Sequence, residues 1–508
     1  MGDIGEFLVM VMQVTVFVFR ITFKLAGFIF KGLFQLIQFI FKLIRGAIGK
    51  TKSVKGVGFS FPSTNGATLK IANPQRGILV SGGQGSGKTR SLIEPIIWQC
   101  ARKGYSGILY DYESPTLTKY VHTAYQNQQE IKNYYVNFSD LTRTHRLNPL
   151  DHTFMTESAF AKDFADTILS NLASEFIKNP NFFTRSSKSM LAAVFWYLRE
   201  EKPKYCTLPH AIHMILSKDT HKLLSKLAEN MEVEGMIASI QTGLNSPNQN
   251  AGVVGTLQNI ISDLNTPKIA WVLSGNELTL DLNNPTDKKF LTVANTPQIT
   301  TTLSPVISLI FSSALAQMNQ QGKAKSACII DELPRVFIPN LDAIPATARK
   351  NLVAVILALQ DYAQLEDKYG EKKAEVIISV LANQLYGKTT NVNTAERVSK
   401  LFGKYDKAMT SKSTPEQNIF DKNYRTSTVT TSSQQRPVIE PQEVINLATG
   451  QFLFNIVEAD RNVGKFNFKQ HSYKVTDLPA FSNADQQTVK QNFERIRSEA
   501  LAIVNGDL

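Results

Sequence analysis

The chain is poor in cysteine, and the spacing of its cysteines excludes two kinds of small stabilised domain. Only three occur in 508 residues, at Cys100, Cys206 and Cys328, more than 100 positions apart and without a CxxC pair. Disulfide frameworks and structural zinc sites need a denser set of cysteines. Both are therefore excluded, and a reducing cytosolic setting fits. A chain of this length predicts several domains and a large buried core.

Excess positive charge is scarce outside the amino terminus. The formal net charge is +12, but the first 55 residues alone hold eight Lys or Arg against two Asp or Glu. The other 453 residues carry 47 basic and 41 acidic side chains, so the body is only mildly basic. This balance excludes a histone-like or polybasic protein, and composition alone does not indicate a nucleic-acid partner.

The amino terminus lacks an uncharged apolar run of the usual membrane-spanning length, yet it predicts a membrane helix. At about 100° per residue, the polar side chains from Glu6 to Arg45 fall on one stripe roughly 80° wide. A single helix of that length exceeds a bilayer core. Residues 1–52 are therefore predicted to anchor the protein by spanning the bilayer or, as the open alternative, by lying in its interface. The basic residues that follow predict an inner-membrane protein with a cytosolic body.

The body predicts an α/β fold that a group of helices interrupts. Apolar runs typical of buried strands alternate with helical patterns, as in a parallel sheet covered on both faces. Residues 155–285 lack such runs and predict an inserted all-α domain. Residues 53–154 and 286–475 are then two parts of one nucleotide-binding domain. A segment rich in Ser, Thr, Gln and Asn predicts a mobile loop over residues 408–437, and residues 476–508 predict a C-terminal helical tail.

One glycine-rich segment matches the phosphate-binding pattern G-x-x-x-x-G-K-[ST]. It lies between a predicted strand and a predicted helix and comprises Gly82, Gly83, Gln84, Gly85, Ser86, Gly87, Lys88 and Thr89. Glycines allow backbone N–H groups to face the phosphates of a nucleotide. We expect Lys88 to reach the β- and γ-phosphate oxygens of ATP and Thr89 to hold Mg²⁺ through its hydroxyl.

A second buried strand, predicted to end at Ile330, is followed by two acidic residues, Asp331 and Glu332. We expect Asp331 to join the magnesium shell and Glu332 to orient or deprotonate the attacking water. An adjacent acidic pair, rather than a single Asp, is what water activation would use. It therefore favours an ATP hydrolase over a kinase.

Two further polar residues are candidate catalytic groups. Gln360 ends the predicted strand Val353–Leu359, where its amide would contact the γ-phosphate. Arg349 lies in a predicted helix, from which it would reach the nucleotide of a neighbouring subunit as an arginine finger. The alternatives are a surface glutamine that starts a helix and an exposed helical arginine.

These ordered motifs resemble those of the type IV secretion system coupling proteins, the membrane-anchored ATPases that bring DNA to a conjugation channel. The resemblance covers about residues 53–475 and also includes residues 148–151, 394–403 and 436–441. It implies a RecA-like P-loop ATPase domain interrupted by an all-α domain. It also implies a homo-hexamer with ATP bound between subunits.

The resemblance further implies a function and partners. ATP hydrolysis, with Mg²⁺ as cofactor, would move single-stranded DNA and its relaxase into the type IV secretion channel. Export of protein effectors alone, and a non-hydrolysing docking receptor assembled by ATP, are the alternatives. Three features depart from the family pattern: one striped helix in place of two membrane spans, the sequence of residues 111–115, and a short C-terminal tail in place of a long acidic one.

Overall fold

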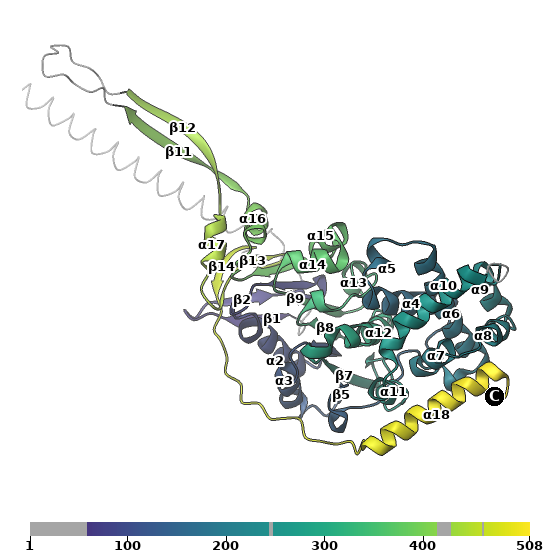
Figure 1. Ribbon diagram of the computed structural model, residues 1–508. Coiled ribbons are helices and arrows are strands. Elements are labelled where there is room, and N and C mark those ends of the chain that lie inside the picture. Colours follow the sequence, from purple (N-terminus) through teal and green to yellow (C-terminus); the bar gives the residue numbers. More distant parts are fainter. Residues whose placement is uncertain (1–57, 243–246, 414–427, 460–461) are drawn as a thin grey trace, which may run out of the picture. The chain divides into compact units, whose positions relative to one another are not determined.

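The computed structural model describes residues 58–242, 247–413, 428–459 and 462–508 (Figure 1). The chain divides into two compact units, residues 1–55 and 56–508. The predicted membrane helix over residues 1–52 lies outside the described residues. All elements described belong to the second unit.

A ten-stranded, mostly parallel sheet forms the centre of the second unit. The parallel strands have the order β10, β3, β9, β8, β4, β7, β5; β13 and then β14 extend the sheet antiparallel beyond β10, and β6 pairs antiparallel with β7. The strands are β3 (Ile78–Ser81), β4 (Ser106–Asp111), β5 (Ile131–Asn137), β6 (Asn283–Asn284), β7 (Asp287–Ala294), β8 (Ser326–Ile330), β9 (Val353–Leu359), β10 (Asn383–Tyr386), β13 (Gln451–Ile456) and β14 (Val463–Asn467). A separate antiparallel pair comprises β1 (Phe59–Pro62) and β2 (Thr68–Ile71).

Helices cover both faces of the sheet. Successive residues of a strand point to opposite faces, so each strand contributes side chains to two cores. Ile108 and Tyr110 of β4 share a core with α12 and the inserted helices, whereas Leu109 packs with α2 and α3 on the other face. Helices outside the insert are α2 (Glu94–Arg102), α3 (Thr116–Tyr125), α12 (Thr300–Met318), α13 (Ile344–Ala348), α14 (Tyr362–Tyr369), α15 (Glu371–Ser379), α16 (Val392–Leu401), α17 (Pro441–Ile445) and α18 (Gln486–Asn505).

Helices alone fill the described chain between β5 and β6, apart from short turns and connecting segments. They are α4 (Ser158–Leu172), α5 (Glu175–Lys178), α6 (Phe182–Glu201), α7 (Leu208–Ile215), α8 (Thr220–Leu227), α9 (Met231–Thr242), α10 (Pro247–Ile261) and α11 (Pro267–Val272). Among the described residues, one helix is long and apolar enough to cross a membrane, Pro297–Met318. Most of its apolar stretch is buried, and it packs against α4 as a core helix.

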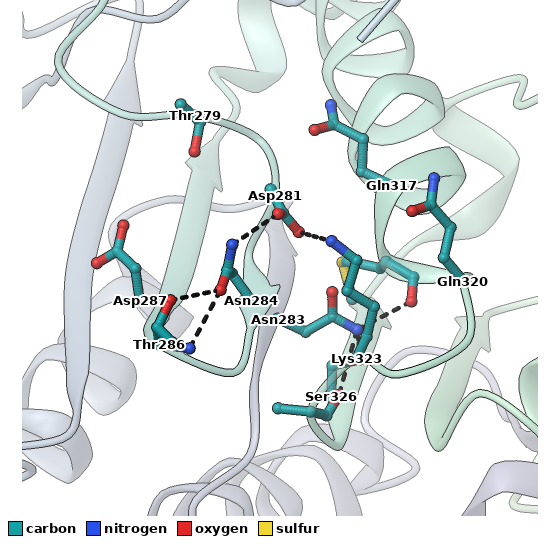
Figure 2. A network of polar contacts seen from close by, with 12 residues as sticks. Thr279, Asp281, Asn283, Asn284, Thr286, Asp287, Gln317, Gln320, Lys323 and Ser326 are labelled. Carbon is teal, nitrogen blue, oxygen red and sulfur yellow. Dashed lines mark hydrogen bonds and ion pairs between the residues drawn. The ribbon is translucent and has the colours of Figure 1, made fainter.

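A network of hydrogen bonds stabilises β6, where the chain returns from the insert to the sheet (Figure 2). The buried Asn283 side chain donates hydrogen bonds to the carbonyl oxygens of Met318 and Ala324, at 2.9 and 3.2 Å, and to the hydroxyl of Ser326 at 3.2 Å. These bonds join β6 to the end of α12 and the start of β8. One side chain therefore holds three segments together.

Replacing Asn283 by alanine is expected to lower the free energy of unfolding by about 2–3 kcal/mol, because buried acceptors lose their donor. Urea unfolding of the full chain measures this change. Asn284→Ala is the matched control, since among the described residues its side chain bonds only to Asp281 and Thr286, in a more exposed place. Equal losses for the two variants would contradict the role given to Asn283.

Part of the segment predicted as a mobile loop, residues 408–437, consists of strands in the structure. Lys404–Ser413 (β11) and Thr428–Pro437 (β12) form an antiparallel hairpin with ten register pairs, and residues 414–427 lie outside the described residues. The described side chains are exposed on both faces of the strands as far as Gln435. With no buried face, the strands show no alternation of apolar and polar residues, so the sequence pattern could not reveal them.

The predicted C-terminal tail is helical only from Gln486, ten residues after its predicted start. It is docked on the insert, because α18 contacts α7, α8 and α11 and buries Ile496 and Ile503. The ring of His210 in α7 lies 3.1 Å from the carboxylate of Glu499 in α18. The last helix of the chain thus completes the core of the inserted domain.

Candidate nucleotide-binding site

The glycine-rich loop follows β3 at the carboxyl edge of the sheet. Thr89–Ile93 forms a turn of π-helix that continues directly into α2. Gly85 and Gly87 have φ values of +74° and +89°, in the left-handed region that side chains disfavour. A Cβ on Gly87 would also lie 2.9 Å from the backbone nitrogen of Gly450. The loop conformation therefore requires glycine at this position.

Two other segments hold the loop in place. The N–H of Gly83 donates to the carbonyl oxygen of Lys388, just beyond β10, at 2.7 Å. The N–H of Gly450, just before β13, donates to the carbonyl oxygen of Ser86 at 2.9 Å. Neither support was predicted from the sequence. An isolated glycine such as Gly450 before a predicted strand was the sole hint, and it indicates close backbone approach only in general terms.

Lys88 is buried at the base of the loop. Its ammonium donates to the carbonyl oxygen of Leu359 at 3.0 Å and lies 4.0 Å from Oε2 of Glu332. Burial lowers the pKa of Lys88, and the charges of Glu332 and Asp331 oppose that shift. Since Leu359 ends β9 and the acidic pair follows β8, the lysine lies at the carboxyl ends of three adjacent strands.

The acidic pair lies in the same buried place. Burial raises the pKa of Asp331 to about 7, and the charge of Asp111, at the end of the neighbouring β4, adds to the shift. Burial also raises the pKa of Glu332, while Lys88 and Arg335 oppose the rise. Oδ1 of Asp111 is buried without a hydrogen-bond partner among the described residues. The site therefore concentrates carboxylates that a cation would stabilise.

The structure brings Gln360 to the acidic pair. Its side chain and backbone amide both stabilise the charged form of the Glu332 carboxylate and so oppose the rise of its pKa. Arg349 instead caps the C-terminus of α13 with its side chain exposed. Its contact with the nucleotide of a neighbouring subunit stays a prediction.

The residues of the site fit a magnesium ion that a nucleotide brings with it. Within residues 58–508, outside the three undescribed gaps, no three His, Cys, Asp or Glu side chains form a metal-holding group. Mg²⁺ is commonly held by one or two carboxylates together with substrate phosphates and water, rather than by a protein cage. Thr89 and Asp331 would supply the hydroxyl and the carboxylate of such a shell.

Comparison with known families decides the relationship that the motifs suggest. The model of the family described as "Type IV secretory system Conjugative DNA transfer" matches residues 42–458. The chain belongs to this family. The coupling protein TraD of Escherichia coli (strain K12) is a relative that is 34% identical over 98 residues, which cover 18% of this chain and 14% of TraD. The chain thus aligns with much less than two thirds of TraD.

Solved structures of another coupling protein resemble the fold. TrwB without its first 70 residues has a TM-score of 0.62 and 16% identity, over 83% of this chain and 91% of that one. TrwB with the non-hydrolysable ATP analogue ADPNP has a TM-score of 0.61 and 17% identity, over 81% and 89%. TrwB with ADP and Mg²⁺ has a TM-score of 0.60 and 16% identity, over 82% and 88%. The predicted RecA-like P-loop ATPase fold with an inserted all-α domain is confirmed.

Proposed function

We propose that the protein is a membrane-anchored ATP hydrolase that drives single-stranded DNA, with its relaxase, into a type IV secretion channel. The carrying observation is that Lys88, Glu332 and Gln360 meet beside a phosphate-binding loop in a member of the conjugative DNA-transfer family. TrwB, of similar fold, has been solved with ADPNP and with ADP and Mg²⁺. ATP and Mg²⁺ are accordingly the proposed ligands.

Each side chain has a defined task in hydrolysis. The loop N–H groups bind the phosphates, and the Lys88 ammonium turns from the Leu359 carbonyl to the β- and γ-phosphate oxygens. Glu332 accepts the proton of the attacking water as the general base. Gln360 orients that carboxylate and senses the γ-phosphate. Thr89 and Asp331 would hold Mg²⁺, which would neutralise charge at the phosphates when it is bound.

The proposed assembly is a homo-hexamer on the inner membrane. Residues 1–52 anchor each subunit in the lipid, and ATP lies between subunits. Arg349 is exposed, as a residue that acts on a neighbouring subunit must be. The relaxase complex delivers the DNA, and the channel proteins receive it.

The ATPase rate of the full chain, with and without a single-stranded oligonucleotide, tests this function. We expect hydrolysis that the oligonucleotide stimulates severalfold, because a motor uses ATP in step with its cargo. Hydrolysis that ignores DNA would instead support a cargo of protein alone. No hydrolysis from an assembled protein would support the docking receptor.

A further inference from the structure

Both faces of the β11–β12 hairpin are open to solvent. Every described side chain of residues 404–411 and 429–435 is exposed, and Figure 1 shows the hairpin extending beyond α16 and α17. A two-stranded hairpin without a covered face is at best marginally stable in water. A partner that lies along the hairpin would supply the missing contacts.

Positive charge is concentrated on this hairpin. Its two strands carry Lys404, Lys407, Lys412 and Arg436 against the single acidic residue Asp406. The strands therefore contribute +3, half of the excess of +6 that residues 56–508 carry. Twenty residues hold as much excess charge as the rest of the body, which indicates a polyanionic partner.

The side chains on one face of the hairpin suit a nucleic-acid strand. The register pairs Tyr405 with Arg436 and Lys407 with Gln434, and alternate residues of a strand share a face. The Tyr405 side chain is 48% exposed, so its ring is available to stack on a base. Lysine, arginine and glutamine side chains bind phosphate oxygens. A membrane surface would instead select a broad apolar face, which this hairpin lacks.

The first strand of the hairpin is connected to the nucleotide site through α16. The hydroxyl of Thr394, in the first turn of α16, donates to the carboxylate of Asp361 at 2.9 Å, and Asp361 directly follows Gln360. Just before α16, Lys388 accepts the hydrogen bond from Gly83 of the phosphate loop. β11 is therefore linked through α16 and the residues before it to Asp361, next to Gln360, and to Gly83 of the phosphate loop.

The second strand leads to the same loop through α17. Its end is tied to α16, because the hydroxyl of Ser399 donates to the carbonyl oxygen of Ile439 at 2.6 Å. Beyond α17, the hydroxyl of Thr449 donates to the carbonyl oxygen of Gly85 at 3.0 Å. The hairpin thus lies in the chain between the two segments that contact the phosphate loop, at Lys388 and at Thr449–Gly450.

We propose that the β11–β12 hairpin is the arm with which each subunit grips the single-stranded DNA, and that the grip reaches the phosphate loop through Lys388 and Thr449–Gly450. This inference rests on the proposed function, since it takes DNA as the cargo and ATP as the ligand. It adds the surface that meets the cargo and the route by which cargo controls hydrolysis.

Two triple variants of the full chain test the proposal. They are K404Q/K407Q/R436Q in the hairpin and, as a control with the same loss of charge at exposed lysines elsewhere, K218Q/K222Q/K372Q. Binding of a fluorescent oligothymidylate is measured over a range of salt concentrations, and the ATPase rate is measured with and without it. For the hairpin variant we expect the DNA affinity to fall by about tenfold or more. We also expect the slope of log affinity against log salt concentration to be shallower by about two.

The ATPase rate separates a DNA-gripping arm from other roles. We expect the hairpin variant to keep the basal rate and lose the stimulation by DNA, whereas the control keeps both. If DNA stimulates the parent protein and stimulates the hairpin variant equally, the proposed DNA-gripping arm is overturned but the proposed function is not. An equal loss of DNA stimulation in the control variant would also overturn the arm. A hairpin variant with a changed subunit number and unchanged DNA affinity would overturn it too, and would show that the hairpin is a contact between subunits. A parent protein that neither binds nor responds to DNA overturns the proposed function as well.

Discussion

Replacing Lys88 by alanine is expected to reduce the ATPase rate at least about a hundredfold. The lysine is the buried cation of the phosphate site, 3.0 Å from the Leu359 carbonyl and 4.0 Å from Glu332. Removal of one preorganised group that stabilises transition-state charge typically costs about 10²–10³ in rate. Steady-state phosphate release from the full chain measures the effect, and a fluorescent nucleotide measures the accompanying loss of affinity.

Lys289→Ala is a matched control for the loss of a buried lysine. The Lys289 side chain is only 5% exposed and pairs with Asp287, in the first half of β7 and so away from the carboxyl edge of the sheet. We expect this variant to lose stability and to keep ATP hydrolysis in the folded fraction. Equal losses of activity in the two variants would show that Lys88 acts through folding.

Replacing Glu332 by glutamine is expected to stop hydrolysis and to preserve ATP binding. Glutamine has the size of glutamate, but it cannot accept a proton from water. Loss of a general base typically reduces the rate by about 10²–10⁴. Rapid filtration with radiolabelled ATP would show nucleotide retained unhydrolysed, whereas Lys88→Ala would retain little.

Asp331→Asn distinguishes the two acidic residues. The Asp331 carboxylate is assigned to the magnesium shell, so its loss is expected to raise the Mg²⁺ concentration needed for half-maximal activity. Glu332→Gln is expected to leave that concentration unchanged. Hydrolysis at the parental rate by Glu332→Gln would place the base elsewhere, and the buried Asp111 carboxylate would be the next candidate.

The sequence predicted the central sheet and the residues of its carboxyl edge because both follow from local rules. Strands buried on both faces are continuous apolar runs, and the loop from Gly82 to Thr89 matches the pattern of phosphate-binding loops. Parallel strands end at one edge, so Glu332 and Gln360 were expected to lie near Lys88. The structure brings these three side chains together.

Features that depend on long-range contacts could not be predicted in this way. The supports of the phosphate loop at Lys388 and Gly450 are backbone contacts between segments hundreds of residues from the loop, and no side-chain pattern encodes them. The β11–β12 hairpin has no buried face, so it lacks the alternation by which strands are recognised. The docking of α18 also depends on contacts between its apolar residues and the inserted helices, which lie far from it in the sequence.

ATP-dependent displacement of streptavidin from the end of a biotinylated single-stranded oligonucleotide tests the proposed motor most directly. A protein that moves along DNA by hydrolysing ATP is expected to free the oligonucleotide when ATP is supplied. Glu332→Gln is expected to bind the same DNA and leave the streptavidin in place. Displacement by Glu332→Gln at the parental rate, or DNA-stimulated hydrolysis in the parent protein without any displacement, would contradict an ATP-driven motor.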